Sequence, residues 1–404
     1  MRLRSDSVQV VIVGAGPAGL AVSSRLARIG SPHLVLERGR VGWSWRTQRW
    51  DSFRLNTPRW ANRVLGRSLA GGRDTFATAG ALVAALERSA KRLPVAEGVE
   101  VFSARRTGPS WRLDTTRGPI SAETVVVASG FQNVPRRPVY ADALPKQIRQ
   151  LHAADYRNPA GLDDGVLVVG GAQSGLQIAQ DLVDAGKRVY LATSRVGRLP
   201  RRFAGRDAFE WLRETGQLDV AREDADPSMI AATPPQVSGA RGGRTLSYQA
   251  LASRGVTLLG RARGSNAGRL ELAGDLGKNI RFADDVSSFF RATWEKRARL
   301  RAGSREVDAA DERAPQLYDA PGPASLDLVA EGISTVVWAT GFGPSTGWLP
   351  ADALDRRRRP RLPGLHVIGA PWLTHRASGS LYGMLSDADR LVSSLARTPI
   401  RLAA

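Results

Sequence analysis

Two glycine-rich segments have the residue types and spacing that hold the pyrophosphate of a dinucleotide. They are Gly14-Ala15-Gly16-Pro17-Ala18-Gly19 and Gly170-Gly171-Ala172-Gln173-Ser174-Gly175. In such a motif the first glycine permits a tight turn, the second lets the backbone approach the phosphates, and the third lets the next helix pack against the preceding strand. Ala172 replaces the middle glycine of the second motif. Both segments predict phosphates bound at the N-terminal amides of a helix.

The residues after the first motif indicate a nucleotide with a free ribose 2′-hydroxyl. Glu37 lies 23 residues after Gly14, at the end of an expected strand over 33–36. A carboxylate there can accept hydrogen bonds from the 2′-hydroxyl of FAD or NAD. The cofactor-binding residues predicted for this site are Gly14, Gly16, Pro17, Ala18, Gly19, Glu37 and Arg38.

The residues after the second motif indicate a nucleotide with a 2′-phosphate. Ser194 and Arg195 follow the expected strand over 188–191, with Arg201 and Arg202 in the same loop. A carboxylate would repel the phosphate, whereas a hydroxyl and guanidinium groups can bind it. The sequence therefore predicts an NADPH site. Its predicted residues are Gly170, Gln173, Ser174, Gly175, Ser194, Arg195, Arg201 and Arg202.

Each motif lies where a strand should meet a helix. The β-branched runs 10–13 and 166–169 predict buried parallel strands, and helices are expected over 17–29 and 174–185. One glycine turn can be purely structural. Two turns in the same strand-turn-helix-strand context, each followed by a different and matching residue type, make a purely structural origin a poor explanation.

The order of the segments predicts the fold class. Expected strands 124–127 and 335–338 each lead into a small-small-Gly turn, Ala128-Ser129-Gly130 and Ala339-Thr340-Gly341. Such turns mark crossings between two nucleotide-binding domains. We therefore predict an α/β protein with two nested Rossmann-like dinucleotide-binding domains, and we expect Thr340 and Gly341 at the cofactor. The predicted limits are 1–138 and 333–404 for the FAD domain, 139–157 for a linker and 158–332 for the NADPH domain.

Composition excludes several classes of protein. The 404 residues include no cysteine, so there are no disulfides, thiolate metal sites or redox dithiols. The four histidines are scattered, and we expect no metal. No apolar run approaches the length of a membrane span, and no signal-peptide pattern precedes the first strand, so we expect a cytoplasmic protein without a membrane partner.

The net charge of +20 raises the question of nucleic-acid binding. Arginine supplies most of this charge and is spread along the chain, which indicates a compositional bias and no nucleic-acid partner. The one dense run, 356–359, is interpreted as a solvated turn, with an anionic partner or a membrane surface as the alternative.

One aromatic and polar segment gives the chain a family resemblance. Gly42-Trp43-Ser44-Trp45-Arg46 and the following 49–58, RWDSFRLNTP, resemble the segment that surrounds the isoalloxazine in single-component flavin-dependent monooxygenases. This group includes flavin-containing, N-hydroxylating and Baeyer-Villiger monooxygenases. The resemblance covers nearly the whole chain. Trp45, Arg46, Asn56 and Thr57 are the cofactor-binding residues it implies.

The resemblance implies that NADPH reduces FAD and that a flavin C4a-hydroperoxide then transfers oxygen to nitrogen, sulfur or an activated carbon of a small molecule. Arg54 and Asn56 are expected to stabilise this intermediate, and His375 and Arg376 to face the substrate. The implied partners are a small-molecule substrate and dioxygen, and a homodimer is compatible with the sequence. The alternatives are Baeyer-Villiger oxidation of a ketone and an NADPH-consuming reductase or oxidase.

The fingerprint of the group, FxGxxxHxxx followed by an aromatic residue, is kept only in part. His152 and Tyr156 are present, but Lys146 and Ile148 replace the phenylalanine and the glycine. His152 is either a hinge or cofactor contact, or a packed structural residue.

Weaker patterns fill the rest of the chain. We expect a helix over 78–92 and a small accessory sheet from strands 99–105, 111–115 and 119–121. A further helix is expected over 284–303 and an exposed connector over 309–327. The last strand, 365–368, and last helix, 381–397, resemble the end of an FAD domain, whose helix dipole stabilises negative charge on reduced flavin.

Overall fold

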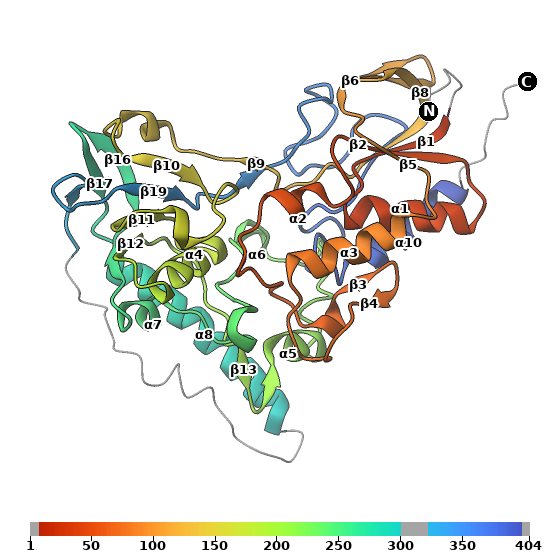
Figure 1. The fold of residues 1–404 in the computed structure, drawn as a ribbon. Coiled ribbons are helices and arrows are strands. Elements are labelled where there is room, and N and C mark those ends of the chain that lie inside the picture. The colour runs from red at the N-terminus through yellow and green to blue at the C-terminus, as the bar shows by residue number, and fades with distance from the viewer. Residues whose placement is uncertain (1–7, 300–321, 398–404) are drawn as a thin grey trace, which may run out of the picture.

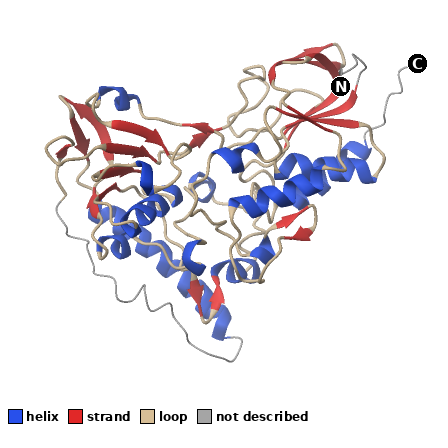
Figure 2. Cartoon of the chain, viewed as in Figure 1, coloured by secondary structure: helices blue, strands red, loops and turns tan. Residues whose placement is uncertain are grey.

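The computed structural model of the protein describes residues 8–299 and 322–397. It contains two sheets built on parallel strands, each packed against helices and joined by narrow connections (Figures 1 and 2). The prediction of two nested Rossmann-like units is confirmed. Positions 300–303 of the expected helix and 309–321 of the expected connector lie outside the described residues.

The first sheet has seven strands in the order β5-β2-β1-β8-β7-β6, with β21 paired to β8. The strands are β1 (Val8–Val13), β2 (His33–Glu37), β5 (Val95–Glu97), β6 (Val101–Thr107), β7 (Ser110–Thr115), β8 (Gly118–Val127) and β21 (Leu365–Val367). Val13 pairs with both Leu36 and Val127 in parallel register. The carboxyl ends of three strands therefore meet at one edge, where open α/β sheets bind ligands.

The accessory strands belong to this same sheet, contrary to the prediction of a separate one. β8 is a single ten-residue strand; residues 118–122 pair with β7 and residues 122–127 with β1. Ala122 lies at the change of partner and is fully buried. The strands expected over 119–121 and 124–127 are therefore parts of one strand, because the backbone stays extended through Ala122 and Glu123.

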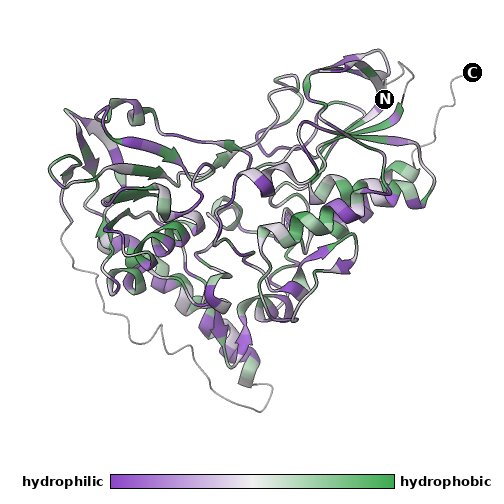
Figure 3. Ribbon diagram, in the orientation of Figure 1, coloured by the Kyte–Doolittle hydropathy of each residue, from purple (hydrophilic) through white to green (hydrophobic). Residues whose placement is uncertain are grey.

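Helices cover one face of the first sheet. They are α1 (Pro17–Arg28), α3 (Ala79–Ala90) and α10 (Met384–Arg397), and their apolar sides share one core with Val10 and Ile12 (Figure 1). On the other face, Trp111 of β7 and Trp348 belong to a second core with Val11 and Val13. In Figure 3 much of the central strands is drawn green, and residues 10–13 of β1 are buried.

The second sheet has five parallel strands in the order β10-β19-β11-β12-β15. The strands are β10 (Arg149–His152), β11 (Val166–Val169), β12 (Val189–Ala192), β15 (Thr257–Leu259) and β19 (Thr335–Trp338). The sequence analysis placed 149–152 in the linker and 335–338 in the FAD domain. Strand pairing puts both in this sheet, because β19 pairs with β10 on one side and with β11 on the other. We therefore propose limits of Arg149 and Trp338 for the second domain.

Two layers cover the second sheet. One core lies under α4 (Gln173–Asp184), α7 (Tyr248–Ala252) and α8 (Leu276–Arg299). The opposite core lies under an antiparallel sheet of β16 (Ala262–Asn266), β17 (Arg269–Leu272) and β18 (Ser325–Asp327). The α4 helix begins and ends one residue before the predicted limits of 174–185. The second glycine turn therefore lies at its N-terminus.

The two units touch at a crossing and at an insertion. At the crossing, β9 (Val134–Pro135) pairs with β20 (Phe342–Gly343), where the chain enters and leaves the second unit (Figure 1). The insertion comprises β13 (Arg202–Phe203), β14 (Arg206–Asp207) and α5 (Ala208–Glu214), and it packs against α8 and Ala377. The short elements are α2 (Trp43–Thr47), η1 (Arg59–Ala61), β3 (Arg63–Val64), β4 (Arg67–Ser68), η2 (Val139–Ala143), η3 (Pro159–Gly161), α6 (Pro227–Ala231) and η4 (Ala240–Gly242).

Candidate cofactor and active site

A cavity of about 390 Å³ lies at the carboxyl edge of the first sheet. This volume falls in the range of small-molecule sites. The residues predicted to bind FAD that line it are Gly14, Gly16, Pro17, Ala18, Glu37, Arg38 and Trp45. The sequence analysis did not name Arg49 of the aromatic segment as a cofactor contact, and it missed Phe131, Asn133 and Met384, which come from distant segments.

The three glycines of the first turn differ in whether the fold leaves room for a side chain. Gly14 has φ +113°, and a Cβ there would lie 2.4 Å from the Ala128 carbonyl oxygen. A Cβ on Gly19 would lie 2.0 Å from the Gly14 carbonyl oxygen. A Cβ on Gly16 would meet no atom within 4 Å, and this glycine lines the cavity. Gly14 and Gly19 are thus required by the fold, whereas Gly16 keeps open the place where a pyrophosphate would approach the amides of α1.

Glu37 is nearly buried and already holds the turn. Its Oε2 accepts a hydrogen bond from the Ala15 amide at 2.8 Å, and its Oε1 accepts one from the Gly39 amide at 3.0 Å. Burial raises the pKa of Glu37, and the two amide donors oppose this shift. Each carboxylate oxygen keeps a further lone pair for a ribose hydroxyl. The arrangement suits FAD.

Arg49, and not Arg46, is the arginine of the aromatic segment that reaches the cavity. Arg46 donates to the Val41 carbonyl at 3.0 Å and pairs with Glu87 of α3. Arg49 lies 4.7 Å from the Trp45 ring centre and lines the cavity, and burial lowers its pKa to about 10. The prediction for Arg46 is corrected, because only the packed structure shows that an acid of α3 captures it.

Two other residues of this segment serve the loop itself. Arg54 donates to the carbonyls of Ser52 and Phe53 at 3.2 and 3.0 Å. Thr57 Oγ1 donates to Asn62 Oδ1 at 2.5 Å. Neither lines the cavity, so the structure does not place Arg54 or Thr57 at the flavin.

The second turn repeats the geometry of the first. Gly170 has φ +127°, and a Cβ on Gly175 would lie 1.7 Å from the Gly170 carbonyl oxygen. Ala172 precedes α4 in extended conformation, as Gly16 precedes α1. The Gly171 amide donates to Ser194 Oγ at 3.0 Å, which leaves the Ser194 hydroxyl hydrogen for a ligand. Ser174 is half-buried in the first turn of α4.

Of the predicted arginines after this turn, Arg195 is exposed, whereas Arg201 and Arg202 bind other protein groups. Arg195 is exposed and stacks over Phe282 of α8 at 4.4 Å. Arg201 is 1% exposed and pairs with Asp207, so it cannot reach a nucleotide phosphate. Arg202 donates to the Gly242 carbonyl at 3.1 Å, away from the turn. The prediction for Arg201 is corrected, and the phosphate site that we propose keeps Ser194 and Arg195.

We expect Arg195→Ala to lower kcat/KM for NADPH by about 10- to 150-fold, because a hydrogen bond to a charged group contributes about 1.5–3 kcal/mol. The value for NADH should stay nearly unchanged, since NADH lacks the 2′-phosphate. Steady-state kinetics with both nucleotides measure this, with Arg202→Ala as the matched control. Equal losses for the two nucleotides would contradict the phosphate site.

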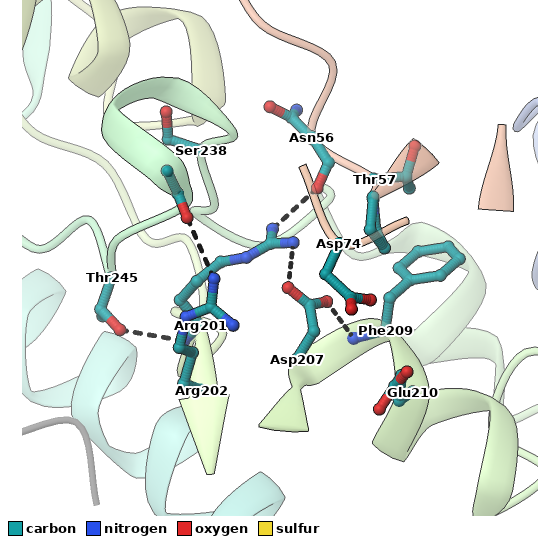
Figure 4. Close-up of polar contacts among 12 residues, drawn as sticks. Asn56, Thr57, Asp74, Arg201, Arg202, Asp207, Phe209, Glu210, Ser238 and Thr245 are labelled. Atoms are coloured by element: carbon teal, nitrogen blue, oxygen red, sulfur yellow. Dashed lines mark hydrogen bonds and ion pairs between the residues drawn. The ribbon is translucent and has the colours of Figure 1, made fainter. Parts of the chain in front are cut away.

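Asn56 lies between the two units and does not line the cavity. Its Nδ2 donates to Gln173 Oε1 at 2.9 Å, and its Oδ1 accepts from Gln177 Nε2 at 2.9 Å. Its carbonyl accepts from Arg201 Nη1 at 2.7 Å (Figure 4). Gln173, predicted as a nucleotide contact, therefore binds the loop that runs from the cavity-lining Arg49 to Asn56, here called the flavin-side loop.

The remaining histidine and turn predictions fall at the crossing. His152 accepts from the Ala154 amide at Nδ1, so its Nε2 donates to the Gly341 carbonyl at 3.1 Å. Burial lowers the pKa of His152. Thr340 Oγ1 donates to the Arg136 carbonyl at 2.5 Å. Neither Thr340 nor Gly341 lines the cavity, and His152 fixes the crossing.

His375 and Arg376 precede α10 but point in different directions. His375 is 7% exposed, and its Nδ1 lies 2.8 Å from Thr374 Oγ1 and 3.0 Å from Ser378 Oγ. Arg376 is half-buried 5.9 Å from the Phe290 ring, and burial lowers its pKa. The structure encloses His375 in a polar cluster, and neither His375 nor Arg376 lines the cavity, so substrate contact by either residue stays a prediction.

The arginine run forms a tight turn beside the cavity. The Asp355 amide donates to the Arg359 carbonyl at 2.9 Å, and Arg358 has φ +62°. The Arg358 guanidinium lies 5.3 Å from the ring of Phe131, which lines the cavity. In residues 8–299 and 322–397, no three His, Asp or Glu side chains are grouped to hold a metal, and no helix is long and apolar enough to span a membrane.

Comparison with known families agrees with the geometry of the two turns. A family described as FAD binding domain matches residues 7–47, and one described as Pyridine nucleotide-disulphide oxidoreductase matches residues 78–204. The chain is a flavin-dependent oxidoreductase. The predicted cofactors, FAD and a pyridine nucleotide, are confirmed at the level of these families.

Two relatives of this oxidoreductase match different shares of its chain. It is 27% identical over 401 residues to an uncharacterized CzcO-like oxidoreductase of Geobacillus kaustophilus, covering 96% of this chain and 98% of the relative. It is 31% identical over 215 residues to an indole-3-pyruvate monooxygenase, YUCCA8, of Oryza sativa, covering 49% and 51%.

Two solved structures share the fold of the oxidoreductase. A flavin monooxygenase from Stenotrophomonas maltophilia, a double mutant, has a TM-score of 0.65 at 19% identity over 96% of this chain and 98% of that one. A bacillithiol disulfide reductase from Bacillus cereus has a TM-score of 0.61 at 14% identity over 98% and 100%. The predicted resemblance to flavin monooxygenases is confirmed, and the fold also serves disulfide reduction.

Proposed function

We propose that this oxidoreductase is an NADPH-dependent monooxygenase that transfers one oxygen atom to nitrogen, sulfur or an activated carbon of a small molecule. Bound FAD would take electrons from NADPH and deliver oxygen from dioxygen. The pair of turns carries the proposal. Glu37 holds the first turn, whereas Ser194 and the exposed Arg195 stand at the second, so the two sites suit different nucleotides.

The residues of the chain supply binding and electrostatics. The N-terminal residue of α10, Met384, lines the cavity, so the positive end of that helix dipole faces the cofactor site. Arg49 stays protonated at neutral pH, since its pKa is lowered only to about 10. Both features stabilise negative charge in the cavity, as reduced flavin requires.

The absence of cysteine distinguishes oxygen transfer from disulfide reduction. The chain shares its fold with a disulfide reductase, but it contains no cysteine at any of its 404 positions. A relay of electrons through a protein dithiol therefore has no residue to carry it. Dioxygen accepts electrons from a reduced flavin without any protein thiol, so the absence of cysteine is compatible with oxygen transfer.

The 31% identity to a monooxygenase over 215 residues also supports oxygen transfer. The ketone-oxidising alternative receives less support. Of its partial fingerprint, His152 binds the Gly341 carbonyl and Tyr156 donates to Asp181 at 2.7 Å, which are structural contacts.

Labelled dioxygen tests the proposal. The yellow holoenzyme is incubated with NADPH, ¹⁸O₂ and a panel of amines, sulfides, ketones and α-keto acids, and products are analysed by mass spectrometry. We expect one ¹⁸O atom per product molecule for one class of substrate, with NADPH consumption rising when that substrate is added. NADPH oxidation that yields only hydrogen peroxide with every class, at a rate no substrate changes, would contradict the proposal and indicate an oxidase.

A further inference from the structure

The side chain of Asn56 is held at both ends by one helix of the other unit. Gln173 accepts from its Nδ2, and Gln177 donates to its Oδ1, each at 2.9 Å. Gln173 is the first residue of α4, and Gln177 lies one turn further along and is 7% exposed. We name Asn56, Gln173 and Gln177 the amide ladder.

The orientation of each amide in the ladder is fixed by its other contacts. Gln173 Nε2 donates to the Pro235 carbonyl at 2.9 Å, and Gln177 Nε2 donates to the Val237 carbonyl at 2.7 Å. A carbonyl can only accept, so both glutamines must present Nε2 to this segment. Gln173 is left with Oε1 for the Asn56 Nδ2. The Asn56 carboxamide therefore cannot turn over without losing hydrogen bonds.

The backbone beside the ladder is fixed as well. Arg201 Nη1 donates to the Asn56 carbonyl at 2.7 Å, and Arg201 pairs with Asp207 at 2.5 Å (Figure 4). The same guanidinium stacks on the Phe76 ring at 4.3 Å. A Cβ on Gly239 would lie 2.0 Å from the Leu55 carbonyl oxygen, so the two backbones are in close contact. The flavin-side loop is thus clamped to the second unit.

The ladder joins the two nucleotide sites by a short route. At one end, α4 begins at the second glycine turn, where the pyrophosphate of NADPH would lie. At the other end, the loop that holds Asn56 continues from Trp45 and Arg49, which line the flavin cavity. The hydrogen bonds of the ladder are 2.7 to 2.9 Å long, which is the ordinary length for an N–H donor and an oxygen acceptor. The geometry between the loop and α4 is therefore well defined.

We propose that Gln173 and Gln177 are positioning residues that hold the flavin-side loop on α4 and so set the approach of the nicotinamide to the flavin. In the step concerned, NADPH loses a hydride and FAD gains it. This inference rests on the two nucleotides of the proposed function and does not depend on oxygen transfer. A misplacement of about 1 Å can lower the rate of such a step about 100-fold.

The test compares Gln177→Leu with Gln180→Leu, a substitution of the same kind on the same helix outside the ladder. Stopped-flow absorbance gives the rate constant of flavin reduction by saturating NADPH and, separately, by dithionite, which needs no nucleotide site. We expect Gln177→Leu to lower the NADPH rate constant about 10- to 100-fold and to leave the dithionite rate constant and FAD content unchanged. Gln180→Leu should change none of them.

A second readout avoids turnover. Titration of oxidised enzyme with NADP⁺ should perturb the flavin absorbance spectrum of wild type and Gln180→Leu, and the perturbation should be smaller in Gln177→Leu. A double-mutant cycle with Asn56→Ala should be non-additive, because either change breaks the same contact.

Three results would overturn the inference. They are equal slowing by NADPH and dithionite, an additive cycle, and an unchanged NADP⁺ spectrum in Gln177→Leu. The outcome is separable from the oxygen test. If no ¹⁸O enters any product while the NADPH and dithionite rates still diverge, the ladder stands and only the monooxygenase proposal falls.

Discussion

Gly16→Val is expected to give a folded protein that has lost its FAD. The Cβ position at Gly16 is open, and its backbone, at φ −79° and ψ −177°, is one that valine adopts readily. The added isopropyl group would occupy the cavity where the pyrophosphate meets the α1 amides. We expect FAD content to fall below about a tenth of the wild-type value, a loss of at least about 1.4 kcal/mol of binding free energy. Absorbance at the flavin band of purified protein measures it.

Two glycine variants make this result specific. Gly161→Val adds the same side chain at an exposed position where a Cβ also meets no atom within 4 Å, and it should keep its flavin. Gly14→Val, with a Cβ 2.4 Å from a backbone oxygen, should fail to fold. Full flavin occupancy in Gly16→Val would mean that this cavity does not hold the FAD pyrophosphate.

Asp207→Ala is expected to destabilise the fold by about 3–5 kcal/mol, because it leaves the buried Arg201 without its counter-ion. The two side chains are 1% and 3% exposed, and their atoms lie 2.5 Å apart. Asp207 also caps α5, since its Oδ1 accepts from the Phe209 amide at 2.8 Å, which adds about 1 kcal/mol. Urea unfolding followed by tryptophan fluorescence measures the change in free energy of unfolding.

Asp226→Ala is the matched control for the capping contribution alone. Asp226 caps α6 through the Ser228 amide at 2.7 Å and is exposed, with no ion pair among the contacts described. We expect a smaller loss of unfolding free energy there, limited to the capping hydrogen bond. If both variants lose the same free energy, the Arg201–Asp207 pair contributes no more than a helix cap, and the clamp on the flavin-side loop is weaker than its geometry indicates.

Local sequence predicted the parts of the fold that backbone chemistry controls. The turns at Gly14 and Gly170 need a positive φ, and Gly19 and Gly175 allow no Cβ, so their positions could be read without a structure. The β-branched runs gave the central strands to within two residues. These features depend on neighbours a few positions away, which the sequence displays directly.

Side-chain partners from distant segments could not be predicted in the same way. Arg46 and Arg49 are both arginines of one short segment, and only the position of Glu87 on α3 decides which of them reaches the cavity. Arg201 was expected at a phosphate, but Asp207 lies within reach once β13 and β14 form a hairpin.

The sequence by itself determined that two dinucleotide turns exist, that an acid follows the first and a serine and an arginine follow the second, and that no thiol chemistry is available. The tertiary structure decided which polar groups remain for ligands, because a buried cation or amide binds the partner that packing brings to it. It also decided the assignment of β10 and β19 to the second sheet and the contact of Asn56 with α4, since strand pairing and contacts between units join residues more than a hundred positions apart.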